Sequence, residues 1–289
     1  MQYRKLGDIE LSRYGLGTKR LPITDVTRVD RVDAEATALI CDAALEQGVN
    51  FIDTSYSHGK GETESILGEY ASAHPDQPLH FSTGYLELVD PRFKVVFDKQ
   101  LKKLQTDCID LYSVEGVCDH TRMRDIDSGA TDFLFEQREA GKVKYLGFSS
   151  ELSADNLAKH LELYPWDFVI MKVNYYDWFM KGGKECYEAA TEAGIPIVAH
   201  APLHIGNRPT LKDEALAVLT EANPERSATD WALRFVKTLD GIVSVTCNVN
   251  STRQVKENAA IFADDAVLDA DEFETLHACA EAQKTVRRR

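Results

Sequence analysis

The chain has no paired cysteines, no long apolar run and no surplus of basic residues. Its six cysteines form no C-x-x-C pair, which argues against zinc-ribbon and iron–sulfur sites and against a disulfide framework. No uninterrupted apolar run is long enough to span a bilayer, and the N-terminal MQYRKLGDIE contains no apolar signal segment. We therefore expect a cytoplasmic protein.

Acidic residues outnumber basic ones, 47 Asp and Glu against 33 Lys and Arg, which leaves a formal net charge of −14. Nucleic acids and anionic membranes are bound by concentrated Lys and Arg, so neither is an expected partner. A small-molecule substrate is the partner that we expect.

Short apolar runs rich in β-formers alternate with amphipathic helical segments along most of the chain. The expected strands are residues 12–18, 49–55, 79–85, 108–115, 143–150, 167–175, 195–203 and 241–248. Most are continuously apolar, as is typical of parallel strands buried on both faces. This alternation indicates a (β/α)₈ barrel or a doubly wound sheet, and the absence of G-x-G-x-x-G after the first strand favours the barrel.

One domain is expected over residues 1–289, because no linker-like segment or internal repeat interrupts the pattern. Residues 1–11 read as a hairpin with a turn at Gly7-Asp8, and residues 264–289 as a final helix and tail. Three helix ends carry signals: Gly48 as a C-cap, Asp90 as an N-cap followed by Pro91, and Ser251 with Gln254 as a capping box.

Polar and titratable side chains follow the expected strands where each one ends, which is the mouth of such a barrel. They are Asp53, Tyr56, His58, Thr83, Gly84, Tyr85, Glu115, Ser149, Ser150, Lys172, Asn174, His200, Cys247 and Asn248. Each taken singly is compatible with a structural role, such as a capping acid, a loop histidine or an interior lysine paired with an acid. Together at one rim they favour a functional site.

Several motifs resemble the aldo-keto reductases. GVNFIDTSYSHGKGETESILG is similar to the signature after their second strand, GxxxFDTAxxYGxxxSExxLG. CIDLYSVEG, GKVKYLGFSS, IPIVAHAPL and QVKEN are similar to further family motifs, in the same order. The resemblance implies a (β/α)₈ barrel that reduces carbonyls with NAD(P)H, using an Asp, a proton-donating Tyr, a Lys and a His.

The resemblance also implies that three of these four catalytic positions are changed. Asp53 matches the Asp, whereas His58 stands at the Tyr, Gly84 at the Lys and Glu115 at the His. The space that a lysine at 84 would fill is left open to water, substrate or another residue.

The cofactor positions implied by the family are partly retained. Ser149, Gln254 and Asn258 match, while His200 replaces the aromatic residue that stacks on the nicotinamide, Asn248 replaces a glycine, and Lys172 aligns with an amide donor. Asn250 stands where a basic residue often binds the 2′-phosphate. Any bound dinucleotide is therefore expected to be NAD rather than NADP.

Different functions stay open at this point. In a modified reductase, His58 would act as general acid, or Tyr56 or Tyr85 would replace the proton donor. Glu115 has a parallel in family members that reduce conjugated C=C bonds, where a neutral Glu polarises the carbonyl.

The alternatives need no nicotinamide. A redox-neutral isomerase, dehydratase or lyase would use the same acids, with Lys172 as a Schiff-base candidate in an apolar wall. Asp53, Glu115, His200 and His58 also offer mixed metal ligands, although their spacing does not require a metal and none is expected. The last hypothesis is a catalytically inactive binding or scaffold protein. An enzyme is favoured over it, because the residues at positions 58 and 115 carry reactive groups.

Overall fold

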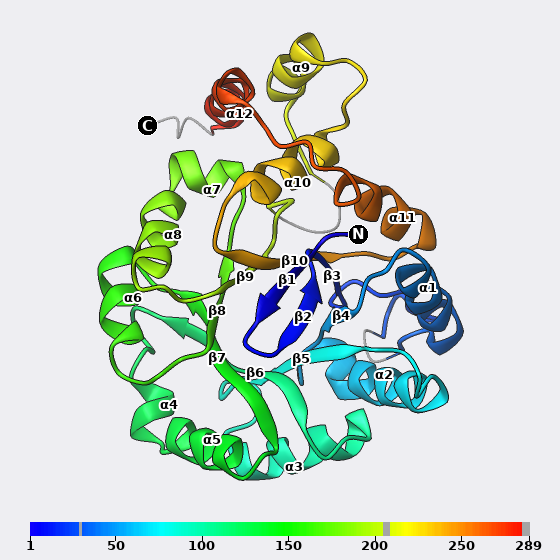
Figure 1. Cartoon of the computed structure of the whole chain (residues 1–289), viewed down its shortest axis with the longest axis vertical. Helices are drawn as coiled ribbons and strands as arrows, with labels where there is room; N and C mark the ends of the chain where they lie inside the picture. Colours follow the sequence, from blue (N-terminus) through cyan, green and yellow to red (C-terminus); the bar gives the residue numbers. More distant parts are fainter. Residues whose placement is uncertain (29–30, 205–208, 285–289) are drawn as a thin grey trace.

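The computed structural model describes residues 1–28, 31–204 and 209–284. Eight parallel strands close into a barrel in the order β10-β3-β4-β5-β6-β7-β8-β9, and helices surround it (Figure 1). The strands are β3 (Tyr14–Gly17), β4 (Phe51–Asp53), β5 (His80–Tyr85), β6 (Ile109–Cys118), β7 (Val143–Glu151), β8 (Phe168–Lys172), β9 (Ile197–His200) and β10 (Ile242–Asn248). The barrel expected from the alternating pattern is confirmed.

The helices connect successive strands on the outside of the barrel or extend its rim. They are α1 (Ala34–Glu46), η1 (His58–Gly61), α2 (Glu62–Ala73), α3 (Phe93–Leu104), α4 (Arg124–Asp127), α5 (Ala130–Glu139), α6 (Ala154–Leu161), α7 (Tyr175–Met180), α8 (Gly183–Glu192), α9 (Asp213–Ala222), α10 (Ala228–Thr238), α11 (Thr252–Ile261) and α12 (Ala270–Gln283). Along the described ranges, we find no helix with the length and apolar character that a membrane span requires.

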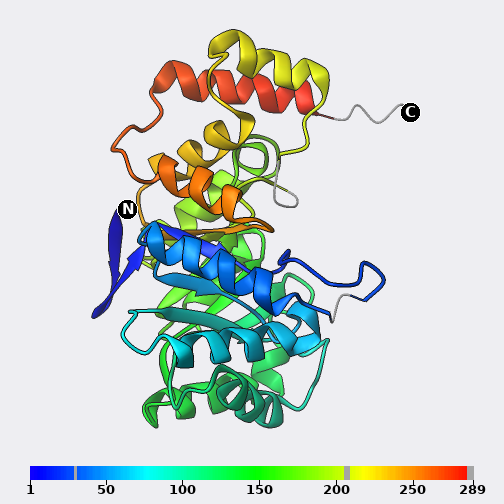
Figure 2. The ribbon, with the colours of Figure 1, turned by 90° about the vertical axis from the view of Figure 1, so that its right-hand side faces the viewer.

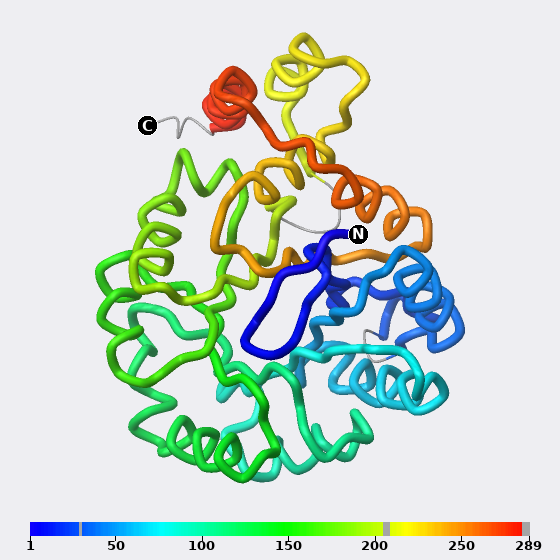
Figure 3. The backbone as a smooth tube through the Cα atoms, viewed as in Figure 1, coloured from blue at the N-terminus to red at the C-terminus, as the bar shows by residue number. Residues whose placement is uncertain are grey.

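A hairpin precedes the barrel and covers one end of it. Strands β1 (Tyr3–Leu6) and β2 (Ile9–Ser12) pair antiparallel around the turn at Gly7, whose φ of +57° suits glycine (Figures 2 and 3). Leu6, Ile9 and Leu11 pack on the first residues of the barrel strands, including Phe51. This closed end therefore lies opposite the carboxyl ends of the strands.

One strand end and one helix start differ from the sequence expectations. Strand β8 ends at Lys172 rather than at 175, because the side chain of Asn174 accepts a hydrogen bond from the Asp177 N–H and begins α7. The N-cap predicted at Asp90 is wrong. Its carboxylate binds the side chain of Arg92, and α3 begins only at Phe93.

The signals at Gly48 and Ser251 are confirmed with one change. Gly48 follows the end of α1 with φ +77° and donates its N–H to the Leu45 carbonyl. Ser251 caps α11 by accepting from the Gln254 N–H, but the Gln254 side chain accepts from the N–H of Asn250 rather than from that of Ser251. The Gln254 side chain therefore binds the backbone N–H one residue before the one that a capping box predicts.

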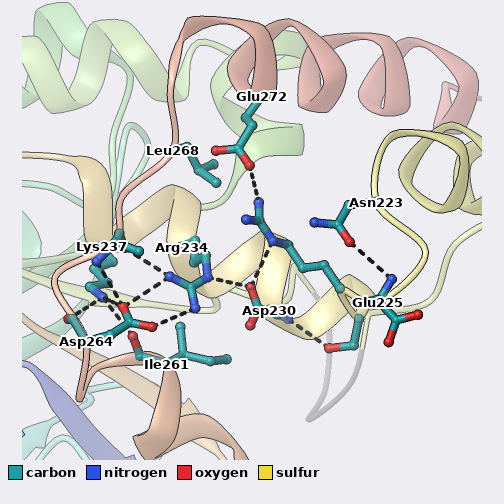
Figure 4. A network of polar contacts seen from close by, with 12 residues as sticks. Asn223, Glu225, Asp230, Arg234, Lys237, Ile261, Asp264, Leu268 and Glu272 are labelled. Atoms are coloured by element: carbon teal, nitrogen blue, oxygen red, sulfur yellow. Dashed lines mark hydrogen bonds and ion pairs between the residues drawn. The ribbon is translucent and has the colours of Figure 1, made fainter.

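A polar network joins α10 to the segments that follow α11 and to α12 (Figure 4). The fully buried Lys237 ammonium donates to the carbonyls of Ile261 and Asp264 and to the Asp264 carboxylate. Arg234 bridges Asp230 and Asp264, so that one carboxylate holds two cations. This network fixes the start of the α12 segment against the barrel.

Candidate active site

A cavity of about 460 Å³ opens at the carboxyl ends of the barrel strands. Its size is that of a small-molecule site, and its position is where barrels of this kind place their chemistry. Its lining includes these residues expected from the sequence: Asp53, His58, Glu115, Ser149, Lys172, His200 and Asn248. The structure therefore brings together side chains from β4, β6, β7, β8, β9 and β10 and from the start of η1.

Two carboxyl groups lie at the floor of this cavity. Burial raises the pKa of Asp53 to about 7. Burial also raises the pKa of Glu115 to about 8, and the nearby Asp53 adds to this rise. The hydrogen bond from the Ser55 hydroxyl acts in the opposite direction and lowers the pKa. The Ser55 hydroxyl donates to Oε2 of Glu115 across 2.9 Å. Glu115 is consequently a neutral carboxylic acid at pH 7.

His58 is held in place but is not charged. Its Nδ1 lies 2.9 Å from the hydroxyl of Thr18, which also donates to the Asp53 carbonyl. Burial, assisted by the charge of Lys19, lowers the pKa of His58 to about 4. The imidazolium that a general acid at 58 would need is therefore scarce at neutral pH.

The position of Gly84 is already filled. A Cβ added there would lie 2.5 Å from the carbonyl oxygen of Ser113 and 2.8 Å from Cγ of Glu115. Of the three occupants expected for the space beside Gly84, the structure shows another residue. The side chain of Glu115 and the backbone of β6 occupy it.

Lys172 and His200 form the opposite wall. The Lys172 ammonium donates to Glu151 across 2.7 Å, and its side chain is 45% exposed. A Schiff-base lysine needs an apolar wall, which this exposed ion pair does not provide. Burial lowers the pKa of His200 to about 4, and its Nε2 has no hydrogen-bond partner among the described residues.

Neither tyrosine considered as a substitute proton donor lines the cavity. Tyr85 is 1% exposed and packs edge-on against Phe93 of α3, outside the barrel wall. The Lys103 ammonium lies 5.0 Å from the ring centre of Tyr56, also outside the lining. The idea that either tyrosine donates the proton therefore loses its geometric basis.

A second hollow, of about 780 Å³, lies along α10 and α11. Gln254 and Asn258 line it, together with Arg234 and Arg253. The Asn258 amide donates to the Tyr14 hydroxyl across 3.3 Å, which ties α11 to β3. These two family-like positions therefore stand apart from the mouth cavity, at the helix that follows Asn248.

The described ranges contain no group of three or more His, Cys, Asp or Glu arranged to hold a metal ion. Asp53, Glu115, His58 and His200 share a cavity without forming such a cluster.

The profile of the Aldo/keto reductase family matches residues 13–281. The chain belongs to the aldo/keto reductase family.

Relatives within this family are distant. The uncharacterized oxidoreductase YqkF of Bacillus subtilis (strain 168) is 24% identical over 292 aligned positions, which cover 89% of this chain and 90% of YqkF. The aldo-keto reductase yakc of Schizosaccharomyces pombe, whose name includes NADP(+), is 30% identical over 188 positions, covering 60% of this chain and 53% of yakc.

A solved structure of the family has the same fold. The holo form of aldo-keto reductase AKR11C1 from Bacillus halodurans superposes with a TM-score of 0.80 at 23% identity, covering 99% of both chains. Its apo form gives a TM-score of 0.76 at 24% identity, again over 99% of both chains. The likeness shows that the two proteins share the same fold.

The residues of this aldo/keto reductase mouth that sequence reasoning missed include Lys19, Arg20, Ser55 and Ser57. Lys19 and Arg20 follow β3 and resemble an ordinary solvated loop. Ser55 and Ser57 follow Asp53 at alternate positions, and that two-residue spacing was the signal available for them.

Proposed function

We propose that this chain is a nicotinamide-linked reductase of small carbonyl compounds, including those whose carbonyl is conjugated to a C=C bond, with Glu115 as its acid. The observation that carries the proposal is the position of the Glu115 carboxyl in the lining of a small-molecule cavity, where burial raises its pKa to about 8. A neutral carboxylic acid donates a hydrogen bond where a carboxylate cannot. Membership of the aldo/keto reductase family supports the reaction class.

Residues of both hollows suit a dinucleotide. In the mouth, Nε2 of His200, which has no hydrogen-bond partner in the described part of the chain, and the side chain of Ser149 line the cavity that would take the nicotinamide. Along α11, Gln254 and Asn258 line the hollow that would take the adenine end. When bound, the reduced nicotinamide supplies the hydride.

NAD is the favoured dinucleotide. The two arginines of the α11 hollow are already paired, Arg253 with Glu257 at 3.4 Å and Arg234 with Asp264 at 3.0 Å. A 2′-phosphate would have to compete with these carboxylates for a cation.

Side chains of this protein would supply the proton for the reaction. Glu115 would donate its proton to the substrate oxygen as that atom gains negative charge. The resulting carboxylate would regain a proton from the Ser55 hydroxyl, 2.9 Å away, and Ser55 would be resupplied by the Ser57 hydroxyl at 3.0 Å. Ser57 is exposed, so this chain of hydroxyls connects the floor of the cavity to solvent.

The test combines binding with turnover. Calorimetry with NADH and NADPH should show binding of at least one, and cyclohexenone or an aromatic aldehyde should then be reduced. Glu115→Gln should lower kcat by about 10² or more while leaving the dissociation constant of the cofactor unchanged, because a positioned acid contributes about 10²–10⁴ in rate. Absence of nicotinamide binding would overturn the proposal in favour of redox-neutral acid/base chemistry. A stable partner protein without any turnover would favour the scaffold reading.

A further inference from the structure

Among the described residues of the mouth cavity, two cations have no ion-pair partner, although the protein is strongly acidic. Lys19 and Arg20 line it, and among the described residues neither side chain has an ion-pair partner. The third cation of the lining, Lys172, is neutralised by Glu151. The unpaired charge thus lies on the loop that follows β3.

The backbone holds this loop at the edge of the cavity. The Thr18 N–H and hydroxyl both donate to the Asp53 carbonyl, and the Lys19 N–H donates to the side chain of Asn248 across 3.1 Å. Leu21, two residues on, is 6% exposed and anchors the loop in the core. Lys19 is therefore fixed at its base between the ends of β4 and β10.

The carboxyl groups of the cavity oppose an incoming anion only in part. The pKa of Glu115 is raised to about 8, the pKa of Asp53 is raised to about 7 so that this group is partly ionised at neutral pH, and Glu151 is already paired with Lys172. Lys19 lies near enough to His58 and His200 to lower the pKa of each. The local field at the mouth is therefore positive, whereas the protein as a whole has a net charge of −14.

We propose that Lys19, assisted by Arg20, binds a carboxylate or another anionic group of the substrate, so that the protein selects small carbonyl compounds that carry a negative charge. This inference rests on the proposed reductase function for the identity of the reacting group. The anion itself has a second source, the phosphates of a dinucleotide, and the experiment separates the two.

The experiment compares 4-formylbenzoate with its methyl ester, which have nearly the same shape but differ by one charge. Calorimetry on the full chain measures the dissociation constant of each ligand, and of NADH separately. The wild type should bind the acid about 10-fold or more tighter than the ester, because a hydrogen bond to a charged group is worth roughly that factor. Raising the salt concentration should weaken binding of the acid alone.

Lys19→Met should abolish the preference for the acid, and Lys19→Arg should retain most of it. Lys142→Met is the matched control, because Lys142 is exposed just before β7 at the closed end of the barrel. Circular dichroism checks that Lys19→Met is folded. If Lys19→Met does not fold, the ratio of acid to ester affinity in Lys19→Arg and in the wild type still tests the proposal.

Equal affinity of the wild type for acid and ester would overturn the inference. So would a loss of NADH affinity in Lys19→Met as large as its loss of acid affinity, because the cations would then serve the cofactor. Failure to reduce either aldehyde would contradict the reductase function instead, and the ligand affinities would still decide whether Lys19 binds a carboxylate.

Discussion

The same strands build the closed end of the barrel and its mouth. On one strand, a residue at the closed end and a residue at the mouth are only two or four positions apart. Strand β4 begins with the buried Phe51 and ends with Asp53, and β6 carries Leu111 near its start and Glu115 toward its end. Because alternate residues of a strand point to the same side, all four face the barrel interior. The first member of each pair packs near the hairpin, and the second lines the cavity.

Burial has opposite consequences at the two ends. At the closed end, apolar side chains leave water, which stabilises the fold by about 25 cal/mol per Å². At the mouth, burial disfavours the charged forms of Asp53 and Glu115 and raises their pKa values. The closed end therefore contributes stability, while the mouth retains groups that are unfavourable for stability and suited to proton transfer.

The largest expected change in the free energy of unfolding comes from a substitution in β8, which carries Phe168 at the closed end and Lys172 at the mouth. Phe168→Ala removes a side chain that is 0% exposed, and should lower the free energy of unfolding by about 3–5 kcal/mol. Lys172→Met removes an exposed ion pair, and should change it by less than about 0.5 kcal/mol. Urea denaturation followed by circular dichroism measures both. Equal losses would contradict the division between the two ends.

A second substitution tests how tightly the mouth is packed beneath its cavity. Gly84→Ala places a Cβ 2.5 Å from the Ser113 carbonyl oxygen, so that β5 or β6 must shift. We expect a loss of about 1–3 kcal/mol in the free energy of unfolding, the usual result of overpacking. Thermal unfolding measures this loss, and an unchanged melting temperature would show that the space beside Gly84 is open after all.

The pH dependence of stability should reveal the neutral acid. The pKa of Glu115 is raised from 4.5 to about 8, so between these values the folded protein holds a proton that the unfolded chain releases. The free energy of unfolding therefore falls as the pH rises through this interval. Glu115→Gln cannot ionise and should be more stable than the wild type above pH 8 by a few kcal/mol, because each unit of pKa shift corresponds to about 1.4 kcal/mol.

The control for that comparison is Glu139→Gln, which removes an exposed carboxylate on α5. It should leave the slope of stability against pH unchanged. A slope that is also unchanged in Glu115→Gln would mean that Glu115 is ionised at neutral pH, against the proposed role.

The smallest effect concerns the hydrogen bond that tunes this acid. The Ser55 hydroxyl lowers the pKa of Glu115, so Ser55→Ala should raise it further, by less than about one unit. The alkaline fall in kcat/KM should move to higher pH by the same amount. A shift to lower pH would show that Ser55 does not donate to the carboxylate.

Much of the site was predictable because parallel strands end at one rim. Asp53, Glu115, Lys172 and His200 are strand ends or lie close to them, and each lines the cavity. Tyr85 also ends its strand, but it is one residue beyond Gly84 and so lies on the other face of β5. The sequence pattern alone did not determine which of these two neighbours faced inward.

Loop geometry limited the remaining predictions. Tyr56 lies beyond β4, where the direction of the chain depends on contacts with α3 that no local pattern encodes. Lys19 belongs to the mouth only because hydrogen bonds to the ends of β4 and β10 hold the loop there. The raised pKa of Glu115 likewise depends first on burial in the folded barrel and then on Asp53, which is distant in sequence.

The ionisation of Glu115 can be measured directly in protein labelled with ¹³C at the glutamate side-chain carboxyl. The resonance that is absent from Glu115→Gln identifies this residue, and its chemical shift is followed by NMR against pH. The account predicts a midpoint near 8. A midpoint near 4.5, the ordinary value for a glutamate, would contradict it.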